Sequence, residues 1–308
     1  MNAHVHLEFS ANKSTLHYGK FMMWLESVIE SRDELINNCH EECITKAIHQ
    51  MLITGTTAFG AISSYGFDLD SCAKAPQKVV YFNELIGSDP TMADVLYSNF
   101  LERLFASQDV NREGFYPAIA IHSPYSVHRV LIQKAINYAQ KHSLKLTAHL
   151  FESRAEREWL DKNDGEFKPF FEHFLKQTKA ANDAKDFLNF FNEIPTLFTH
   201  AIHADEENHA QLSNGDHTVI HCPISNRFLG NGRLNINQLD AHNINWVLGT
   251  DGLSSNYSLD LFEEMKIALF MHHDQDLNQF AKLLWESVTV KPAKALGLNC
   301  GVLTPGYD

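Results

Sequence analysis

Short runs of apolar residues alternate along the chain with longer segments in which apolar residues recur at three- and four-residue spacing. Runs of the first kind are typical of buried parallel strands, and segments of the second kind, such as KFMMWLESVIES (20–31), are typical of amphipathic helices. Eight strands in alternation with helices predict an α/β fold, a TIM-type (β/α)8 barrel. The predicted strands are residues 2–6, 56–62, 78–85, 116–122, 144–150, 195–201, 217–222 and 244–250.

The length of 308 residues suits one large barrel or two ordinary domains. No internal repeat or flexible linker divides the chain, so we interpret residues 1–308 as a single catalytic barrel domain. One segment, at about residues 153–193, is longer than an ordinary crossover and rich in phenylalanine. We expect a helical insertion there, which either forms a lid or simply packs against the barrel.

The formal net charge of −13 argues against nucleic acid and anionic membranes as partners, because both bind basic surfaces. It leaves a small, phosphate-free molecule as a suitable substrate. No apolar run approaches about 18 residues, and the first residues do not resemble an export leader. The five cysteines form no CxxC pair, which is typical of reduced thiols, so we expect a cytoplasmic protein.

Polar residues capable of binding a metal or moving a proton stand at the ends of most predicted strands. In a TIM barrel the carboxyl ends of the strands meet at one face, where active sites lie. The shared position of these residues is therefore the strongest functional signal in the sequence. They are His4, His6, His122, His149, His200, His221 and Asp251.

The residue types suit a metal centre. His4 and His6 are two apart on a strand and therefore point to the same side. Together with His149 and the carboxylate of Asp251 they form a nitrogen and oxygen set suited to zinc, with iron or manganese as alternatives. An open coordination position would make the centre catalytic, because the metal lowers the pKa of a coordinated water toward ~7.

Each of these residues also has a simpler interpretation. An isolated His-x-His pair is often incidental, and a lone strand-end histidine such as His221 is often a hydrogen-bonded core residue. Asp251 in LGTDG could simply begin a turn, because Asp-Gly favours one. Their common place in one ordered barrel favours the metal centre over coincidence.

A general acid and base is expected beside the metal. Glu152 in HLFE (149–152) follows His149 by three residues and lies just beyond the predicted strand. Partial burial would raise the pKa of this carboxyl group, which could then carry a proton in both directions. The alternative is an acidic residue placed favourably at a helix N-terminus, and both roles can hold together.

Six motifs occur in order from residue 2 to about residue 307: NAHVHLE, HSPYS, TAHLFES, THAIHADEE, IHCPISNRFLGNG and LGTDGLSSNYSLDLFEEM. In this order they resemble the amidohydrolase superfamily. The most similar branch holds S-adenosylhomocysteine/methylthioadenosine deaminases, guanine deaminase and triazine hydrolases. The combination of HCPISN, LGNG and LGTDGLSSN makes this resemblance specific.

The resemblance implies a mononuclear divalent metal site, with Zn²⁺ as the first choice and Fe²⁺ or Mn²⁺ as alternatives. It implies Glu152 as the proton carrier to the ring nitrogen of the substrate. His200, together with Asp251, would orient and deprotonate the attacking water. The implied metal ligands are His4, His6, His149 and Asp251.

The same resemblance assigns residues around the substrate. His122 and Ser123 of HSPYS would line the substrate pocket, and Phe9, Phe21 and Trp24 are candidates to stack on a purine ring. Ordinary core packing is the better interpretation of Trp24. Ser225 and Asn226 are expected either to shape the loop that holds His221 or to form a plain turn. These substrate and loop residues are expectations from the resemblance alone.

Residues 7–34 are most similar to the deaminases that act on aminodeoxyfutalosine in menaquinone biosynthesis. The implied reaction is hydrolytic loss of the 6-amino group from an adenine-type nucleoside, as a hydrolase of non-peptide carbon–nitrogen bonds. Alternatives within the branch are methylthioadenosine, adenosylhomocysteine or guanine deaminases and chlorohydrolases. The implied partner is a small nucleoside, with no nucleic acid or membrane; homodimers are common in the branch.

Members of the superfamily usually carry β-sandwich segments on both sides of the barrel. In this sequence only Met1 precedes Asn2, and the last residues are GVLTPGYD, so we expect both sandwich segments to be missing. Because chain ends are poorly ordered unless tied down, we expect weakened metal occupancy and low activity. A metal-poor, inactive barrel is therefore the non-enzyme alternative. A metal-storage protein is disfavoured, because the histidines do not form tracts.

Overall fold

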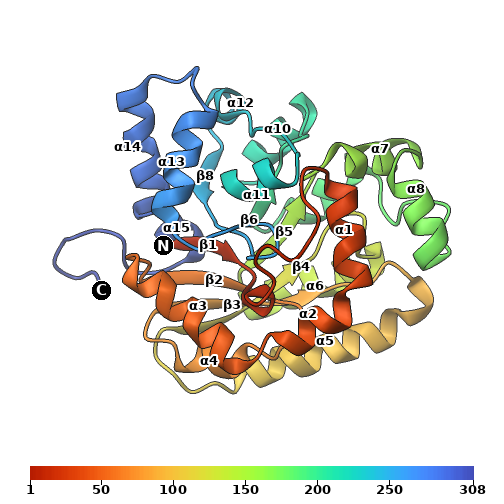
Figure 1. Cartoon of the computed structure of the whole chain (residues 1–308), viewed down its shortest axis with the longest axis horizontal. Coiled ribbons are helices and arrows are strands. Elements are labelled where there is room, and N and C mark those ends of the chain that lie inside the picture. Colours follow the sequence, from red (N-terminus) through yellow and green to blue (C-terminus); the bar gives the residue numbers. More distant parts are fainter.

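The computed structural model describes the backbone of residues 1–308 and every side chain except those of residues 35 and 36. Eight parallel strands pair in sequence order and curve into a barrel surrounded by helices (Figure 1). The predicted α/β barrel is therefore confirmed, and each predicted strand differs from the observed one by at most two residues at either end. The strands are β1 (Asn2–Val5), β2 (Ala58–Ser63), β3 (Lys78–Leu85), β4 (Phe115–Ile121), β5 (Leu146–Leu150), β6 (Thr196–His200), β7 (Thr218–His221) and β8 (Asn245–Leu248).

Helices connect successive strands and cover the outside of the barrel (Figure 1). The α-helices are α1 (Phe21–Glu30), α2 (Arg32–Asn38), α3 (Glu41–Ile53), α4 (Leu69–Lys74), α5 (Ala93–Gln108), α6 (Arg129–His142), α7 (Arg154–Lys162), α8 (Phe167–Phe170), α9 (Ala184–Phe187), α10 (Glu206–Asn214), α11 (Pro223–Phe228), α12 (Ile236–Ala241), α13 (Leu261–Met271), α14 (Leu277–Ser287) and α15 (Val290–Leu296). Shorter helical turns are η1 (Leu7–Phe9), η2 (Pro90–Met92), η3 (Phe171–Leu175) and η4 (Leu188–Phe191).

The apolar strands are buried on both faces, as parallel strands between helices and a barrel interior must be. Alternate residues of β3 divide between two clusters: Val80 and Phe82 pack in one, and Val79 and Tyr81 in the other. The first cluster also contains Leu296 of α15. Helix α15 lies near the start of β1 (Figure 1). The polar residues of the site lie at the opposite, carboxyl ends of the strands.

The first strand is held at the seam between β8 and β1. The backbone amides of Thr250 and Asp251 both donate to the carbonyl oxygen of His4 at 3.1 Å. The Asn2 side-chain oxygen accepts from the Thr250 amide at 3.1 Å, and the Met1 nitrogen donates to the Val288 carbonyl at 2.6 Å. All of β1 is buried. The chain around His4 is therefore tied to the barrel on one side by β2 and on the other by the end of β8.

The segment at 153–193 contains α7, α8, η3, α9 and η4. Its phenylalanines build an aromatic cluster against the loop that follows β4. The ring of Tyr125 lies 4.8 Å from that of Phe167, and the ring of Trp159 lies 4.9 Å from that of Phe171. The side-chain nitrogen of Asn182 donates to the carbonyls of Pro124 and Val127, both at 2.7 Å. The segment thus supports the HSPYS loop.

Within the part of the chain that the structure describes, no helix combines the length and apolar character that a membrane crossing requires.

Candidate metal centre

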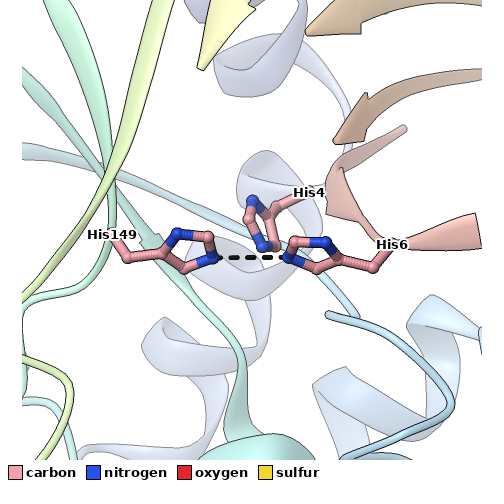
Figure 2. A group of neighbouring side chains, drawn as sticks. All are labelled: His4, His6 and His149. Carbon is pink, nitrogen blue, oxygen red and sulfur yellow. Dashed lines mark hydrogen bonds between the residues drawn. The ribbon is translucent and has the colours of Figure 1, made fainter. Parts of the chain in front are cut away.

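Three histidine rings from two distant strands converge at the carboxyl end of the barrel. His4 lies in β1, His6 follows that strand directly, and His149 lies in β5. Figure 2 shows the rings turned toward one another, with Nε2 of His6 at 3.3 Å from Nε2 of His149. The ring centroid of His4 lies 4.9 Å from that of each of the other two. The nitrogen atoms of the three rings are therefore placed as a group.

Asp251 brings a carboxylate to the same group. Its Oδ1 atom lies 3.7 Å from Nε2 of His4 and 3.6 Å from Nε2 of His6. The other oxygen, Oδ2, accepts hydrogen bonds from the hydroxyls of Ser225 at 2.7 Å and Ser255 at 2.9 Å. These two bonds hold the carboxylate with Oδ1 toward the histidines.

The hydrogen bonds of the outer ring nitrogens suit metal binding at Nε2. Nδ1 of His149 donates to the His122 carbonyl at 2.6 Å, and Nδ1 of His4 lies 3.2 Å from the Thr199 hydroxyl. Among the described residues, Nε2 of His4 is buried without a hydrogen-bond partner, which is costly unless something binds it. Two Nε2 lone pairs at 3.3 Å also repel unless a cation or proton lies between them. The residues therefore fit a divalent metal ion.

Burial keeps these imidazoles in the form that binds metals. Desolvation, reinforced by the neighbouring histidines, lowers the pKa of His6 to about 4. The same causes hold the pKa of His149 well below its ordinary value. Neutral rings at physiological pH offer lone pairs to a metal without first losing a proton.

Glu152 and His200 form a second pair beside this group. Oε2 of Glu152 lies 3.6 Å from Nε2 of His200, and the side-chain nitrogen of Asn231 donates to Oε1 at 3.0 Å. Burial, followed by the charge of Asp251, raises the pKa of Glu152 well above its ordinary value. Burial also lowers the pKa of His200 to about 4. Burial therefore favours the protonated form of Glu152 and the neutral form of His200, which is an arrangement suited to general acid and base catalysis.

The turn after β5 aims Glu152 into the site. Ser153 begins α7 as its N-cap and accepts from the Glu156 amide at 3.1 Å, so Glu152 itself lies outside the helix. Glu156 in turn accepts from the Glu152 amide at 2.7 Å and from the Phe151 amide at 3.2 Å. The helix-terminus acid is therefore Glu156, which leaves the Glu152 carboxyl group for the site.

The strand ends at the site carry strained backbone. Phe151, His200, Ala201 and Asp251 have φ values of +44°, +75°, +51° and +58°. Residues other than glycine rarely adopt this left-handed backbone conformation, because it costs roughly 1–3 kcal/mol per residue. It persists only where the surrounding structure imposes it. The chain is bent in this way at or just after the ends of β5, β6 and β8. The strained residues therefore occur where the chain turns at the candidate site, and His200 and Asp251 are among them.

The predicted substrate residues lie around the histidine group at different depths. The His122 ring lies 5.1 Å from that of His149, and its Nδ1 lies 2.6 Å from the Ser126 hydroxyl. The Ser123 hydroxyl is buried and lies 2.6 Å from the same Ser126 hydroxyl. Phe9 is half-buried, with its ring 6.2 Å from that of His6. The structure thus places His122 and Phe9 beside the site and Ser123 behind it.

The aromatic residues of α1 lie farther from the histidines. Phe21 is buried in the core and packs on Phe167 at a centroid distance of 6.1 Å. Trp24 is half-buried and its indole nitrogen donates to the Ser254 carbonyl at 2.9 Å. This bond ties α1 to the loop after β8. His221 is fully buried and paired with His272, so it is not part of the group that surrounds Nε2 of His4.

Several residues that support the site were not predicted from the sequence. Thr199, Ser255 and the carbonyl of His122 orient side chains of the candidate metal centre, and Asn231 binds Glu152. Glu84 of β3 is buried with Oε1 at 3.9 Å from Nδ1 of His149. Asn231 belongs to the LGNG motif, but a sequence motif alone does not show which side chain its residues contact.

Two surface cavities, of about 260 Å³ and 560 Å³, lie where α6 meets the segment around η4, and share Arg129, Asp186 and Phe190. Neither is lined by a residue of the histidine group, by Glu152 or by Asp251. The candidate metal centre is therefore located by its side-chain chemistry.

Comparisons with other proteins agree with this site. The model of the amidohydrolase family matches residues 1–308, and the chain belongs to that family. A relative from a Nitratiruptor species, an aminodeoxyfutalosine deaminase, is 49% identical over 307 residues, which are 100% of this chain and 75% of the relative. An adenosine deaminase from Helicobacter pylori is 32% identical over 308 residues, covering 98% of this chain and 74% of the relative.

A solved structure, Helicobacter pylori aminofutalosine deaminase in complex with methylthio-coformycin, superimposes with a TM-score of 0.94 and 32% identity. The match covers 99% of this chain and 75% of that one. The amidohydrolase family is metal-dependent, and this chain contains groups of side chains that could hold a metal ion. These relatives are deaminases of one hydrolase family that acts on carbon–nitrogen bonds.

Proposed function

We propose that this protein is a zinc-dependent aminohydrolase that converts aminodeoxyfutalosine and water to futalosine and ammonia. The observation that carries the proposal is the meeting of a three-histidine group with Asp251, Glu152 and His200 at the carboxyl end of the barrel. The full-length similarity to an aminodeoxyfutalosine deaminase supports the choice of substrate. Menaquinone biosynthesis, a cytoplasmic location and a homodimer remain predictions.

His4, His6, His149 and Asp251 would hold the metal. A bound Zn²⁺ ion would polarise a water molecule and lower its pKa toward ~7. The chain itself fixes the donors: the carbonyl of His122 and the hydroxyl of Thr199 orient two of the rings. Ser225 and Ser255 fix the carboxylate of Asp251.

The reaction requires proton transfers that the remaining residues can perform. The oxygen of the attacking water bonds to C6 of the purine, while the bond from C6 to the amino nitrogen breaks and ammonia leaves. Glu152 donates its proton to the adjacent ring nitrogen, which makes C6 more electrophilic. The proton from Glu152 stays on the ring nitrogen in the product. The water gives up two protons through His200 and Asp251: one passes to the leaving amino group, which departs as ammonia, and the other restores the proton on Glu152. No net proton is gained or lost.

Methylthioadenosine is the second candidate substrate. The observation that favours it is the complex of the Helicobacter pylori neighbour with methylthio-coformycin, a ligand with a methylthio group. Both candidates are 6-aminopurine nucleosides with a substituent at the 5′ position. Phe9 and His122 lie beside the site where such a purine would bind, and the 153–193 segment would cover the substituent.

The test is to measure kcat/KM for aminodeoxyfutalosine, methylthioadenosine and guanine side by side, following ammonia release. We expect aminodeoxyfutalosine to be preferred, with methylthioadenosine second. Glu158→Gln serves as a control variant, because Glu158 lies on the surface of α7 and pairs with Arg154 instead of the site. A clear preference for guanine would refute the nucleoside assignment.

A further inference from the structure

Asn226 connects two groups of buried histidines. It lies in α11 and is fully buried. Its side-chain oxygen lies 3.0 Å from Nδ1 of His200, and its side-chain nitrogen lies 3.3 Å from Nδ1 of His221. Nε2 of His221 then lies 3.2 Å from Nε2 of His272. A row of hydrogen bonds therefore runs from the site to His272.

The amide group of Asn226 gives this row a direction. Its oxygen only accepts hydrogen bonds and its nitrogen only donates them. Nδ1 of His200 must therefore carry a hydrogen, and Nδ1 of His221 must carry none. Burial lowers the pKa of His221 well below its ordinary value and so favours the neutral ring. The hydrogen of that ring then lies on Nε2 and is donated to His272. In this arrangement each of the three hydrogen bonds in the row has one donor and one acceptor.

The arrangement matters at the end of the row that faces the site. A neutral His200 with its hydrogen on Nδ1 presents the lone pair of Nε2 to Oε2 of Glu152, 3.6 Å away. A carboxyl group that carries a proton can donate toward that lone pair. In the opposite tautomer the hydrogen on Nε2 of His200 would point toward the hydrogen of the Glu152 carboxyl group, and the two would repel. The direction of the Asn226 amide thus decides whether the two groups are complementary.

The backbone links Asn226 to both members of the acid–base pair. His200 and Ala201 adopt successive left-handed conformations, which require strong local contacts, and the side chain of Asn226 binds the ring of His200. The carbonyl of Asn226 accepts from the Asn231 amide at 3.0 Å, and Asn231 binds Glu152. Asn226 therefore contacts His200 through its side chain. Through its backbone carbonyl it also contacts Asn231, the residue that binds Glu152.

We propose that Asn226 is a positioning residue that fixes the tautomer of His200, so that Nε2 accepts hydrogen bonds within the site. The role that this gives to His200 in deamination rests on the proposed function. The tautomer itself does not, because it depends only on the hydrogen bonds among Asn226, His200 and His221. The two ideas can therefore fail separately.

The direct test is nitrogen NMR of the full chain with ¹⁵N-labelled histidines, using His200→Gln to identify the signals of His200. We expect a neutral ring with its hydrogen on Nδ1. In Asn226→Leu, where the side chain neither donates nor accepts, we expect a mixture of tautomers at His200. In Asn226→Asp, the new carboxylate still accepts from Nδ1, so His200 should keep its tautomer while His221 reverses its own.

Asn208→Leu is the matched control, because Asn208 is also buried but binds Arg157 and Asp205. It should leave the His200 signals unchanged. We expect kcat for deamination to fall about 10–100-fold in Asn226→Leu and less in Asn226→Asp, as for other residues that orient a catalytic group. A hydrogen on Nε2 of His200 in the unaltered chain, or unchanged His200 signals in Asn226→Leu, would overturn the proposal. Correct tautomers without deamination would contradict only the proposed function.

Discussion

Glu152 and Asp251 are buried carboxyl groups beside the same histidines, but their surroundings favour opposite protonation states. Burial and the charge of Asp251 raise the pKa of Glu152. Burial also acts to raise the pKa of Asp251, but its contacts with His4 and His6 outweigh that effect and hold the pKa well below its ordinary value. One carboxyl group can therefore donate a proton while the other remains an anion that can bind a metal.

Glu152→Gln should bind as much metal as the unaltered chain but lose most of its turnover, because an amide cannot transfer the proton. We expect kcat to fall on the order of 10²–10⁴-fold, as for loss of a general acid and base. The measurement is kcat together with metal content per chain. Glu158→Gln, a surface change on α7, is the control. Near-normal turnover in a metal-loaded Glu152→Gln sample would exclude this role.

Asp251→Asn should be more damaging than Glu152→Gln, because it weakens both metal binding and the acceptance of a proton from water. The amide also loses the charge that the hydroxyls of Ser225 and Ser255 stabilise. Metal content and kcat should therefore fall together. If both survive the change, Asp251 is only the turn residue that LGTDG also allows.

At the scale of elements, the start of α7 determines where Glu152 points. Glu156 lies in the first turn and is buried, with its oxygens bonded to the amides of Phe151 and Glu152. Burial raises the pKa of Glu156 from its ordinary value of 4.5 to about 7, although these backbone bonds act in the opposite direction. The buried Glu156 that supports this turn therefore lowers the stability of the folded chain when its carboxyl group is ionised.

This cost predicts a pH dependence. Between pH 4.5 and pH 7 the folded chain retains a proton on Glu156 that the unfolded chain releases, so stability falls as pH rises through this range. Relative to Glu156→Gln, the unaltered chain should lose on the order of 3 kcal/mol of unfolding free energy between pH 4 and pH 8. Urea unfolding of both chains at these two pH values measures the difference. If the difference in unfolding free energy between the two chains is the same at pH 4 and pH 8, the raised pKa of Glu156 is contradicted.

The first strand and the residue directly after it supply two of the three histidines, so the contacts that hold this strand in place affect metal binding. It is buried, paired with β2 and bonded to the end of β8 through the carbonyl of His4. This support gives His4 a defined position in the barrel. The expectation that metal occupancy is only partial concerns binding in solution and remains a prediction.

At the scale of the whole molecule, the barrel could be predicted because each strand is a short apolar run and its neighbours in the sheet follow in sequence order. The same rule brought His4, His149 and Asp251 together, since parallel strands end at one face. The contacts of Thr199, Ser255 and Asn231 could not be predicted. They depend on side-chain directions and tautomers that arise only when strands distant in sequence are packed together.

The most direct test of the account is to titrate metal-free protein with Zn²⁺ while measuring bound metal and ammonia release from aminodeoxyfutalosine in the same samples. We expect activity to rise in proportion to bound metal and to level off at about one ion per chain, as four ligands around one position imply. His149→Ala should remain without tightly bound metal and without activity. Deamination by metal-free protein, or one bound ion per chain with no deamination of aminodeoxyfutalosine or methylthioadenosine, would contradict the account.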